Sequence, residues 1–222
     1  MDKVAFLAVC IFFSFCAFGQ VSRVTLEAKK IPEPTVRDSI VDNWNRKSPV
    51  FGLISNAQKE MLYWSNYSRI NPGRFWDSVI FPILVVFPQL NGDEAKTLKA
   101  ELTSKVSLPL FTLNPSLTAT SQSHAKDIAT NNLGLSHSSS SGKDFSTRMK
   151  QAGIQHCAAE NIAMANDNIL LALALLYLDI GLKEAGHRRA LLNGLFSEIG
   201  IGASFSAKGQ LFLVQDFSCP QK

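Results

Sequence analysis

An almost uninterrupted apolar run, Ile169–Leu178, is the feature that most constrains how this chain folds. Ten residues without a polar face are typical of a helix that is buried on most sides. Two compact polar clusters flank the run, Ala159–Ile162 (AENI) before it and Glu184–Arg188 (EAGHR) after it. Ionisable residues placed against such a run indicate a polar site on a packed core. His137 lies upstream in a Ser-rich loop, and we expect these segments to converge on one cavity.

Capping and turn signals predict a layered α+β domain. Ser55 opens an amphipathic helix with a capping box, and Asn114, followed by proline, opens another. Toward the end of the chain, Glu198–Phe205 and Leu211–Phe217 have strand patterns and are joined by a turn at Gly209, which predicts a hairpin. Helices followed by strands, with no βαβ repeat, favour an α+β fold over a doubly wound sheet.

The length of 222 residues fits one sizeable domain better than two. Residues 1–19 are interpreted as a cleavable signal peptide, because Lys3 precedes the apolar run Val4–Phe18; a retained anchor helix is the alternative. We therefore expect a secreted or periplasmic protein whose mature chain has no transmembrane span. Residues 20–52 are expected to form a loosely packed N-terminal arm, and residues 53–219 the folded domain.

Two further stretches bear on possible partners. Val79–Leu90 is apolar but interrupted by two prolines, so we expect a buried connector; a membrane-touching loop is the alternative. The net charge of +4 is spread thinly, without a Lys/Arg block, which argues against nucleic-acid binding. The expected partner is an unidentified small ligand or another protein.

Cys157 and Cys219 are the two cysteines that remain after removal of the signal peptide. An even pair in an exported chain favours a disulfide between them. Two separate buried thiols are the alternative interpretation.

Several short motifs, in their order along the chain, resemble the CAP superfamily of cysteine-rich secretory proteins, antigen five and pathogenesis-related proteins, in its bacterial branch. The resemblance covers roughly residues 53–218, and no single motif is specific by itself. The motifs are Asn66–Pro72, Leu113–Ala129, Ser136-His137, Arg148, Gly153, Ala159–Ala163, Gly186-His187-Arg188 and Ile199–Gly202.

The resemblance implies an α-β-α sandwich (the SCP-like fold) in an exported protein, with a cleft where two histidines and two glutamates meet. Carried over by position, these are His137, Glu160, Glu184 and His187. The chain departs from the family pattern at Gly181, where the family has a tryptophan before the second glutamate. That departure affects the expected shape of the cleft more than the fold.

The four cleft residues suit a divalent cation such as Zn²⁺, with His137 and His187 as the ligands. Glu160 and Glu184 would orient the imidazoles through their second nitrogen or through a bound water. A closed hydrogen-bond network of the same four residues, with no ligand, is an equally weighted alternative. A metal-dependent hydrolase, protease-like, is a less favoured one, and no catalytic residue is assigned, because no nucleophile motif is present.

Three further polar residues are expected to have structural or solvent-facing roles. His124, on the core-facing side of a predicted helix, is interpreted as a packed, hydrogen-bonded histidine outside the cleft. Asn161 is expected to tie down backbone after Glu160. Arg188 is expected to be solvated, as a single arginine usually is.

Overall fold

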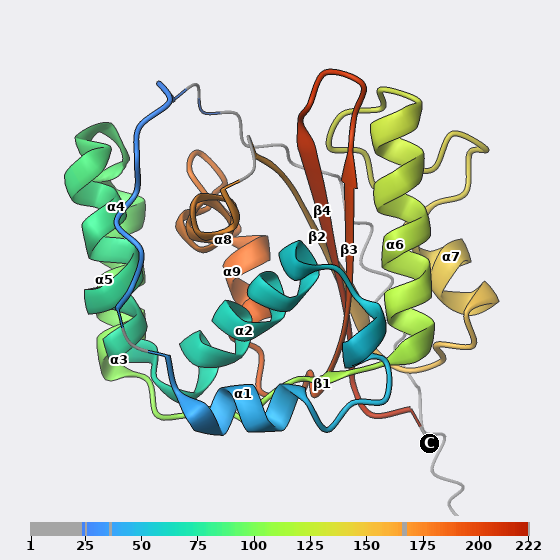
Figure 1. Ribbon diagram of the computed structural model, residues 1–222, viewed down its shortest axis with the longest axis horizontal. Helices are drawn as coiled ribbons and strands as arrows, with labels where there is room; N and C mark the ends of the chain where they lie inside the picture. The colour runs from blue at the N-terminus through green and yellow to red at the C-terminus, as the bar shows by residue number, and fades with distance from the viewer. Residues whose placement is uncertain (1–23, 25, 36, 166–167, 222) are drawn as a thin grey trace, which may run out of the picture.

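A computed structural model describes residues 24, 26–35, 37–165 and 168–221 (Figure 1). The predicted signal peptide, residues 1–19, lies outside the described residues. Within the described part, no helix is both long enough and apolar enough to cross a membrane.

One four-stranded sheet, in the order β1-β3-β4-β2, forms the centre of the fold (Figure 1). The predicted hairpin is confirmed: β3 and β4 are antiparallel neighbours. β2 adds to the free side of β4 in antiparallel pairing, and the short β1 pairs with β3 in parallel. The strands are β1 (Thr112–Leu113), β2 (Ala158–Ala165), β3 (Glu198–Phe205) and β4 (Leu211–Ser218).

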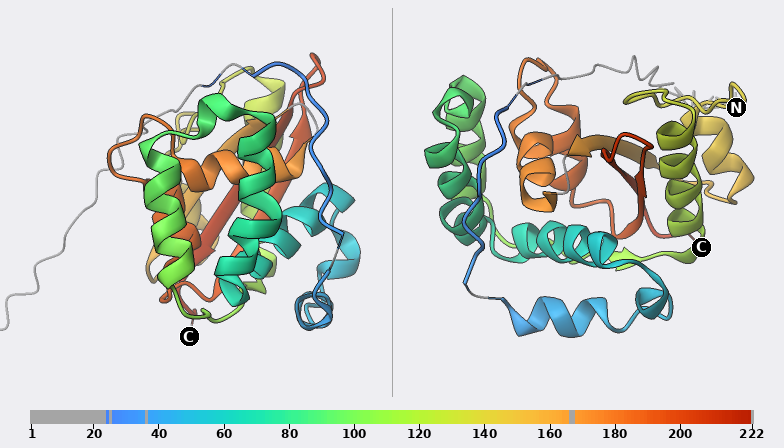
Figure 2. Two further views of the ribbon diagram at one scale, coloured as in Figure 1. Left: turned by 90° about the vertical axis from the view of Figure 1, so that its left-hand side faces the viewer. Right: turned by 45° about the horizontal axis from the view of Figure 1, so that its top comes forward.

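Helices cover both faces of this sheet, so the predicted α-β-α sandwich is observed (Figures 1 and 2). α6 (Pro115–Thr130) and α7 (Phe145–Gln151) lie on one side. α2 (Asn56–Ile70), α8 (Ile169–Leu178) and α9 (Gly186–Leu191) lie on the other. The edge strand β2 borders both layers, and it therefore contacts α8 and α9 while one of its faces is turned toward α6.

The helices begin where the sequence signals place them. Ser55 and Gln58 form a reciprocal capping box at the start of α2. The side chain of Asn114 caps α6, and Asn168 caps α8 in the same way. Each cap satisfies backbone N–H groups that have no partner inside the helix.

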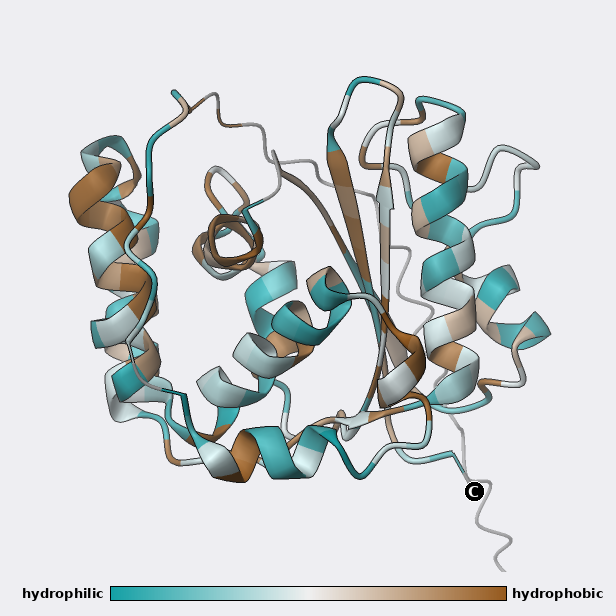
Figure 3. Cartoon of the chain, viewed as in Figure 1, coloured by the Kyte–Doolittle hydropathy of each residue, from teal (hydrophilic) through white to brown (hydrophobic). Residues whose placement is uncertain are grey.

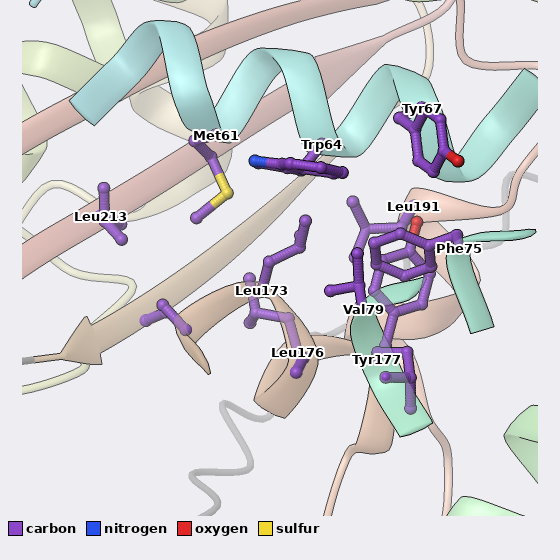
Figure 4. Packing of buried hydrophobic residues seen from close by; sticks show 14 of the residues in the cluster. Met61, Trp64, Tyr67, Phe75, Val79, Leu173, Leu176, Tyr177, Leu191 and Leu213 are labelled. Atoms are coloured by element: carbon purple, nitrogen blue, oxygen red, sulfur yellow. The ribbon is translucent and has the colours of Figure 1, made fainter. Parts of the chain in front are cut away.

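α8 is the apolar run identified in the sequence, and it is apolar around its circumference (Figure 3). Its inner residues, Leu173 and Leu176 among them, pack against Met61 and Trp64 of α2 (Figure 4). Tyr177 is fully buried beside Phe75 and shares a short hydrogen bond with Ser68. Burial of large side chains from both helices accounts for much of the hydrophobic stabilisation in this layer.

The remaining segments pack outside the α2–α8 layer. The expected buried connector is helical, with Ile80 and Ile83 buried but Phe81 and Val85 more than half exposed. Its elements are the π-helix Trp76–Ile80, α4 (Phe81–Val86) and the 3₁₀ helix Pro88–Leu90, preceded by α3 (Pro72–Phe75) and followed by α5 (Asp93–Ser104).

The N-terminal arm is more firmly attached than the sequence indicated. It contains α1 (Ser39–Asn45) and the 3₁₀ helix Phe51–Leu53. Val41 is fully buried, and the indole N–H of Trp44 donates to the carbonyl of Phe111. The expectation of a loose arm is wrong for this part. Further long-range hydrogen bonds join Asp38 to Tyr63 and Ser48 to Leu113, and such scattered tertiary contacts leave no periodic pattern in the sequence.

α6 lies in direct backbone contact with β3. A Cβ added at Gly200 would be 2.0 Å from the carbonyl carbon of Leu117, and one at Gly202 would be 2.0 Å from the carbonyl oxygen of Ser121. No side chain fits between these two elements. The two glycines therefore set the spacing between α6 and the sheet.

Cys157 and Cys219 form the predicted disulfide, with their Cα atoms 5.5 Å apart. Cys157 immediately precedes β2 and Cys219 follows β4, and the amide of Cys219 also donates to the carbonyl of Cys157. The bridge therefore closes the end of the β2–β4 ladder.

Gly202→Ala should destabilise the protein by at least about 2 kcal/mol, because the added methyl group overlaps α6 backbone that has no room to move. Gly73→Ala is the matched control, because a Cβ there meets nothing within 4 Å and Gly73 lies within α3. It should stabilise the protein by up to about 1 kcal/mol. Urea unfolding compares the two; equal effects would contradict the close contact between α6 and β3.

Replacing both Cys157 and Cys219 by serine should lower the free energy of unfolding by about 4 kcal/mol, because the bridge closes a loop with a sequence separation of 62. Urea unfolding of the double variant against the oxidised protein measures this. Unchanged stability, or two free thiols in the untreated exported protein, would contradict the bridge.

Candidate functional site

The first half of the site is assembled around Glu160 of the edge strand β2. Its side chain is only 1% exposed, although the strand itself lies at the border of the sheet. His137, in the loop after α6, donates from Nδ1 to Oε1 over 2.8 Å. Arg148 of α7 donates from Nη2 to both carboxylate oxygens and to the carbonyl of His137. Strand, loop and helix are thus held together through one buried carboxylate.

A second buried acid, Asp216 of β4, lies directly opposite Glu160 in the strand register. Burial and the neighbouring Glu160 charge raise the pKa of Asp216 well above its usual range. Burial alone would raise the pKa of Glu160 as well, but the hydrogen bond from His137 and the charge of Arg148 lower it. The environment therefore favours the protonated form of Asp216 beside an ionised Glu160, because two neighbouring buried carboxylates do not readily both ionise.

His124 is buried and hydrogen-bonded, as predicted: its Nε2 lies 2.8 Å from the carbonyl oxygen of Ser136. Its position outside the site is corrected, because the same nitrogen lies 4.0 Å from Oε2 of Glu160. Burial lowers the pKa of His124, while the Glu160 charge acts in the opposite direction. The imidazole is therefore neutral and carries its hydrogen on Nε2.

The second half of the site is centred on Asp179, which follows α8 in a left-handed conformation (φ 51°). Its carboxylate accepts from Nδ1 of His187 over 2.5 Å and from the backbone N–H of Arg188 over 2.8 Å. The prediction that Glu184 orients His187 is wrong. Glu184 lies in an exposed loop and pairs with Arg189, while the turn at Asp179 directs a carboxylate at the imidazole.

Arg188 is buried, which corrects the expectation of a solvated side chain. Its guanidinium donates to the carbonyls of Tyr177 and Leu178 at the end of α8 and to that of Glu94 in α5. Cations at a helix C-terminus interact favourably with its free carbonyls. The side chain joins α8, α9 and α5, and so fixes the position of His187.

Asn161 has the structural role that was predicted. Its amide donates to the carbonyl of His187 and to Gln215 of β4. Gln215 in turn donates to Ser65 of α2, so a buried chain of amides links the sheet to the helical layer. This chain connects the His187 half of the site to the strand that carries Glu160.

His137 and His187 line the same cavity, of about 70 Å³. Both imidazoles use Nδ1 for a carboxylate, and among the described residues neither Nε2 has a hydrogen-bond partner. The rest of the wall is mainly aliphatic. It includes Leu135, Ile162, Ala172 and Leu176.

The donor set of this cavity limits what the chain can offer a metal ion. No three His, Cys, Asp or Glu side chains of the described residues group closely enough to hold one. Glu160 and Asp179 are both engaged by imidazole and by arginine side chain or backbone. The chain therefore offers two imidazole nitrogens, and a bound cation would complete its coordination with water or ligand atoms.

Sequence reasoning missed Asp179 and Asp216, and each left a signal. Asp179 is the residue that ends an otherwise apolar run, where a charge must find a partner. Asp216 interrupts the apolar strand Leu211–Phe217 at an inward position.

Asp216→Asn should raise stability at neutral pH. Native Asp216 keeps a proton that the unfolded chain releases above about pH 4, so wild-type stability falls as pH rises from there toward the raised native pKa. An asparagine has nearly the same shape, stays neutral at every pH and needs no proton uptake. Urea unfolding between pH 5 and 8 should show a flatter pH dependence for the variant.

Glu160→Gln is the contrasting variant. It removes the charge that Arg148 and His137 pair with, and should destabilise the protein by about 3–5 kcal/mol. An Asp216→Asn protein destabilised as strongly as this one would show that Asp216 is ionised.

Residues 57–217 match the model of the cysteine-rich secretory protein family, CAP. No curated protein matches the chain.

Solved structures with similarity include an extracellular protein containing an SCP domain from Bacillus anthracis (20% identity, TM-score 0.47), with 74% of this chain and 40% of that chain covered. An outer surface protein from Borrelia burgdorferi is 15% identical with a TM-score of 0.43, covering 63% of this chain and 92% of the other. This chain thus spans 40% of the length of the Bacillus anthracis protein. Because the family model covers most of the sequence, the protein belongs to the cysteine-rich secretory protein (CAP) family.

Proposed function

We propose that this protein is an exported binding module that holds a divalent cation of the zinc class between His137 and His187. One observation carries the proposal: two imidazoles in one cavity each have Nδ1 fixed by a buried carboxylate. A carboxylate that accepts from Nδ1–H leaves the lone pair on Nε2. Both histidines therefore present the nitrogen that a borderline cation binds.

A closed network of four residues explains these contacts less well. Glu184 takes no part, and the remaining residues form two separate carboxylate–imidazole pairs. A closed network would use both nitrogens of each ring. Here only one nitrogen of each is used within the described residues, and the side chains of His137 and His187 remain 26% and 16% exposed.

The cavity wall supports a second role, the capture of a small aliphatic group beside the cation. Leu135, Ile162 and Leu176 line the space next to the imidazoles. About 70 Å³ is room for a few water molecules or a short alkyl group, since one water needs about 10–15 Å³ by this measure. A ligand with a polar donor and a short apolar arm fits this combination.

Hydrolysis is less well supported than binding. A metal-dependent hydrolase needs a general base beside the bound water. Glu160 and Asp179 are buried and already engaged, each holding an imidazole and further N–H donors. Their arrangement favours orientation of the histidines over proton transfer.

Export is part of the proposal. The predicted signal peptide, the family's description as secretory and the Cys157–Cys219 bridge all support it. Disulfides persist in oxidising compartments, whether periplasmic or extracellular.

Calorimetric titration with Zn²⁺ at neutral pH should give saturable binding to the wild-type protein and none to His137→Ala or His187→Ala. Asp179→Asn should weaken binding by about 10–100-fold, because the imidazole loses its charged partner. Binding should also weaken in acid, because protons compete with the cation for the Nε2 lone pairs.

Two controls separate this site from adventitious binding. His156→Ala removes an exposed histidine outside the cavity, and Glu184→Gln removes the acid that the structure places outside the site. Both should bind Zn²⁺ like the wild type. The proposal fails if the wild type shows no saturable binding, or if Glu184→Gln weakens it as much as Asp179→Asn does.

A further inference from the structure

A second, polar cavity of about 450 Å³ lies between α6, the Ser-rich loop and α7. It does not include His137 or His187, and so differs from the cleft described above. Its wall carries hydroxyl, amide and cationic groups. They include side chains of His124, Lys143, Arg148 and Gln151, and Asp127 adds a carboxylate.

Arg148 lines this cavity and carries donors that its known contacts leave unused. Its Nη2 makes every contact with Glu160 and with the carbonyl of His137. Its Nε and Nη1 are buried and have no partner among the described residues. A buried donor without an acceptor costs about 1–3 kcal/mol, so these N–H groups favour a ligand that accepts.

His124 needs a hydrogen-bond donor from the ligand, whereas Arg148 needs an acceptor. Its Nε2–H donates to the carbonyl of Ser136, which leaves a lone pair on Nδ1. Nδ1 is buried and unpartnered among the described residues. The ligand that satisfies it must therefore carry a hydrogen to donate.

The other polar groups of the cavity add further donors. Lys143 donates from Nζ to Gln151 and has two further donors free within the described part of the chain. Asp127 lies on the same wall, but its two oxygens already accept from the backbone and hydroxyl of Ser140. Donors thus exceed acceptors, with His124 Nδ1 as the acceptor.

We propose that this cavity binds a hydrogen phosphate group, either the free ion or a phosphate monoester. Its unprotonated oxygens accept from Arg148 and Lys143, and its P–OH donates to Nδ1 of His124. Sulfate has the same shape and size but is fully deprotonated near neutral pH, so it places an oxygen lone pair against the lone pair of His124. Discrimination between these two anions is therefore the signature of the site.

The experiment is a calorimetric titration of the wild-type protein at pH 5.5–6, where inorganic phosphate and a simple alkyl phosphate both carry a P–OH group. A chelator is present throughout, so that no cation in the His137–His187 cleft can hold the anion. We expect phosphate to bind at least tenfold more tightly than sulfate. Alkyl phosphate binding as tightly as inorganic phosphate indicates a monoester as the ligand; binding of inorganic phosphate alone indicates the free ion.

Lys143→Gln should weaken phosphate binding by about tenfold, through loss of one charge-assisted contact. Lys150→Gln is the matched control, because Lys150 carries the same charge on exposed α7 but does not line the cavity. The Nδ1 resonance of His124 should shift with phosphate and stay in place with sulfate.

Three results would overturn the proposal: no saturable phosphate binding, equal affinity for sulfate, or equal losses in Lys143→Gln and Lys150→Gln. None of them bears on the His137–His187 cleft, which is tested separately with Zn²⁺.

Discussion

Burial of the Glu160 carboxylate is the constraint that determines how the sheet, the Ser-rich loop and α7 fit together. An ionised carboxylate out of water must be paired, and here the partners come from three different elements. His137 brings the Ser-rich loop, Arg148 brings α7, and Asp216 supplies a proton across the strand ladder. The outer helix α7 and the loop are therefore tied to the sheet by polar contacts as well as by a small apolar cluster.

The same principle is used a second time at Asp179. One buried carboxylate at the end of α8 receives an imidazole and a backbone N–H, and Arg188 binds the carbonyls around it. The two halves of the cleft are thus built alike, although one rests on a strand and the other on a helix terminus. In both, the buried acid binds Nδ1 and so determines that Nε2 is the ring nitrogen left for the cavity. The donor atoms that the cleft offers a ligand are therefore set by carboxylates that lie behind the cavity wall.

Local patterns were enough to predict the capped helices, the terminal hairpin and an α+β fold. The α-β-α arrangement and the assignment of the cleft residues rested on the family resemblance. They were not enough for the acids. Glu184 is three residues from His187 in sequence, yet an exposed loop turns it toward Arg189, whereas Asp179 reaches the imidazole only because it adopts a left-handed conformation. Arg188 was expected in solvent and Asp216 was missed, because their roles depend on carbonyls and a carboxylate contributed by distant elements. The spacing of residues along the sequence does not reveal which distant groups a side chain will contact in the fold.

The glycine contacts between β3 and α6 also limit how the molecule can move. Two backbones that touch at Gly200 and Gly202 cannot slide past each other, because any shift along the helix would bring neighbouring side chains into the same space. α6 and the sheet therefore behave as one rigid body. The segments that carry His137 and His187 are joined to this body by loops, and the Glu160 and Asp179 carboxylates hold their imidazoles in place. The glycine contacts thus fix the helix–sheet spacing against which both histidines are positioned.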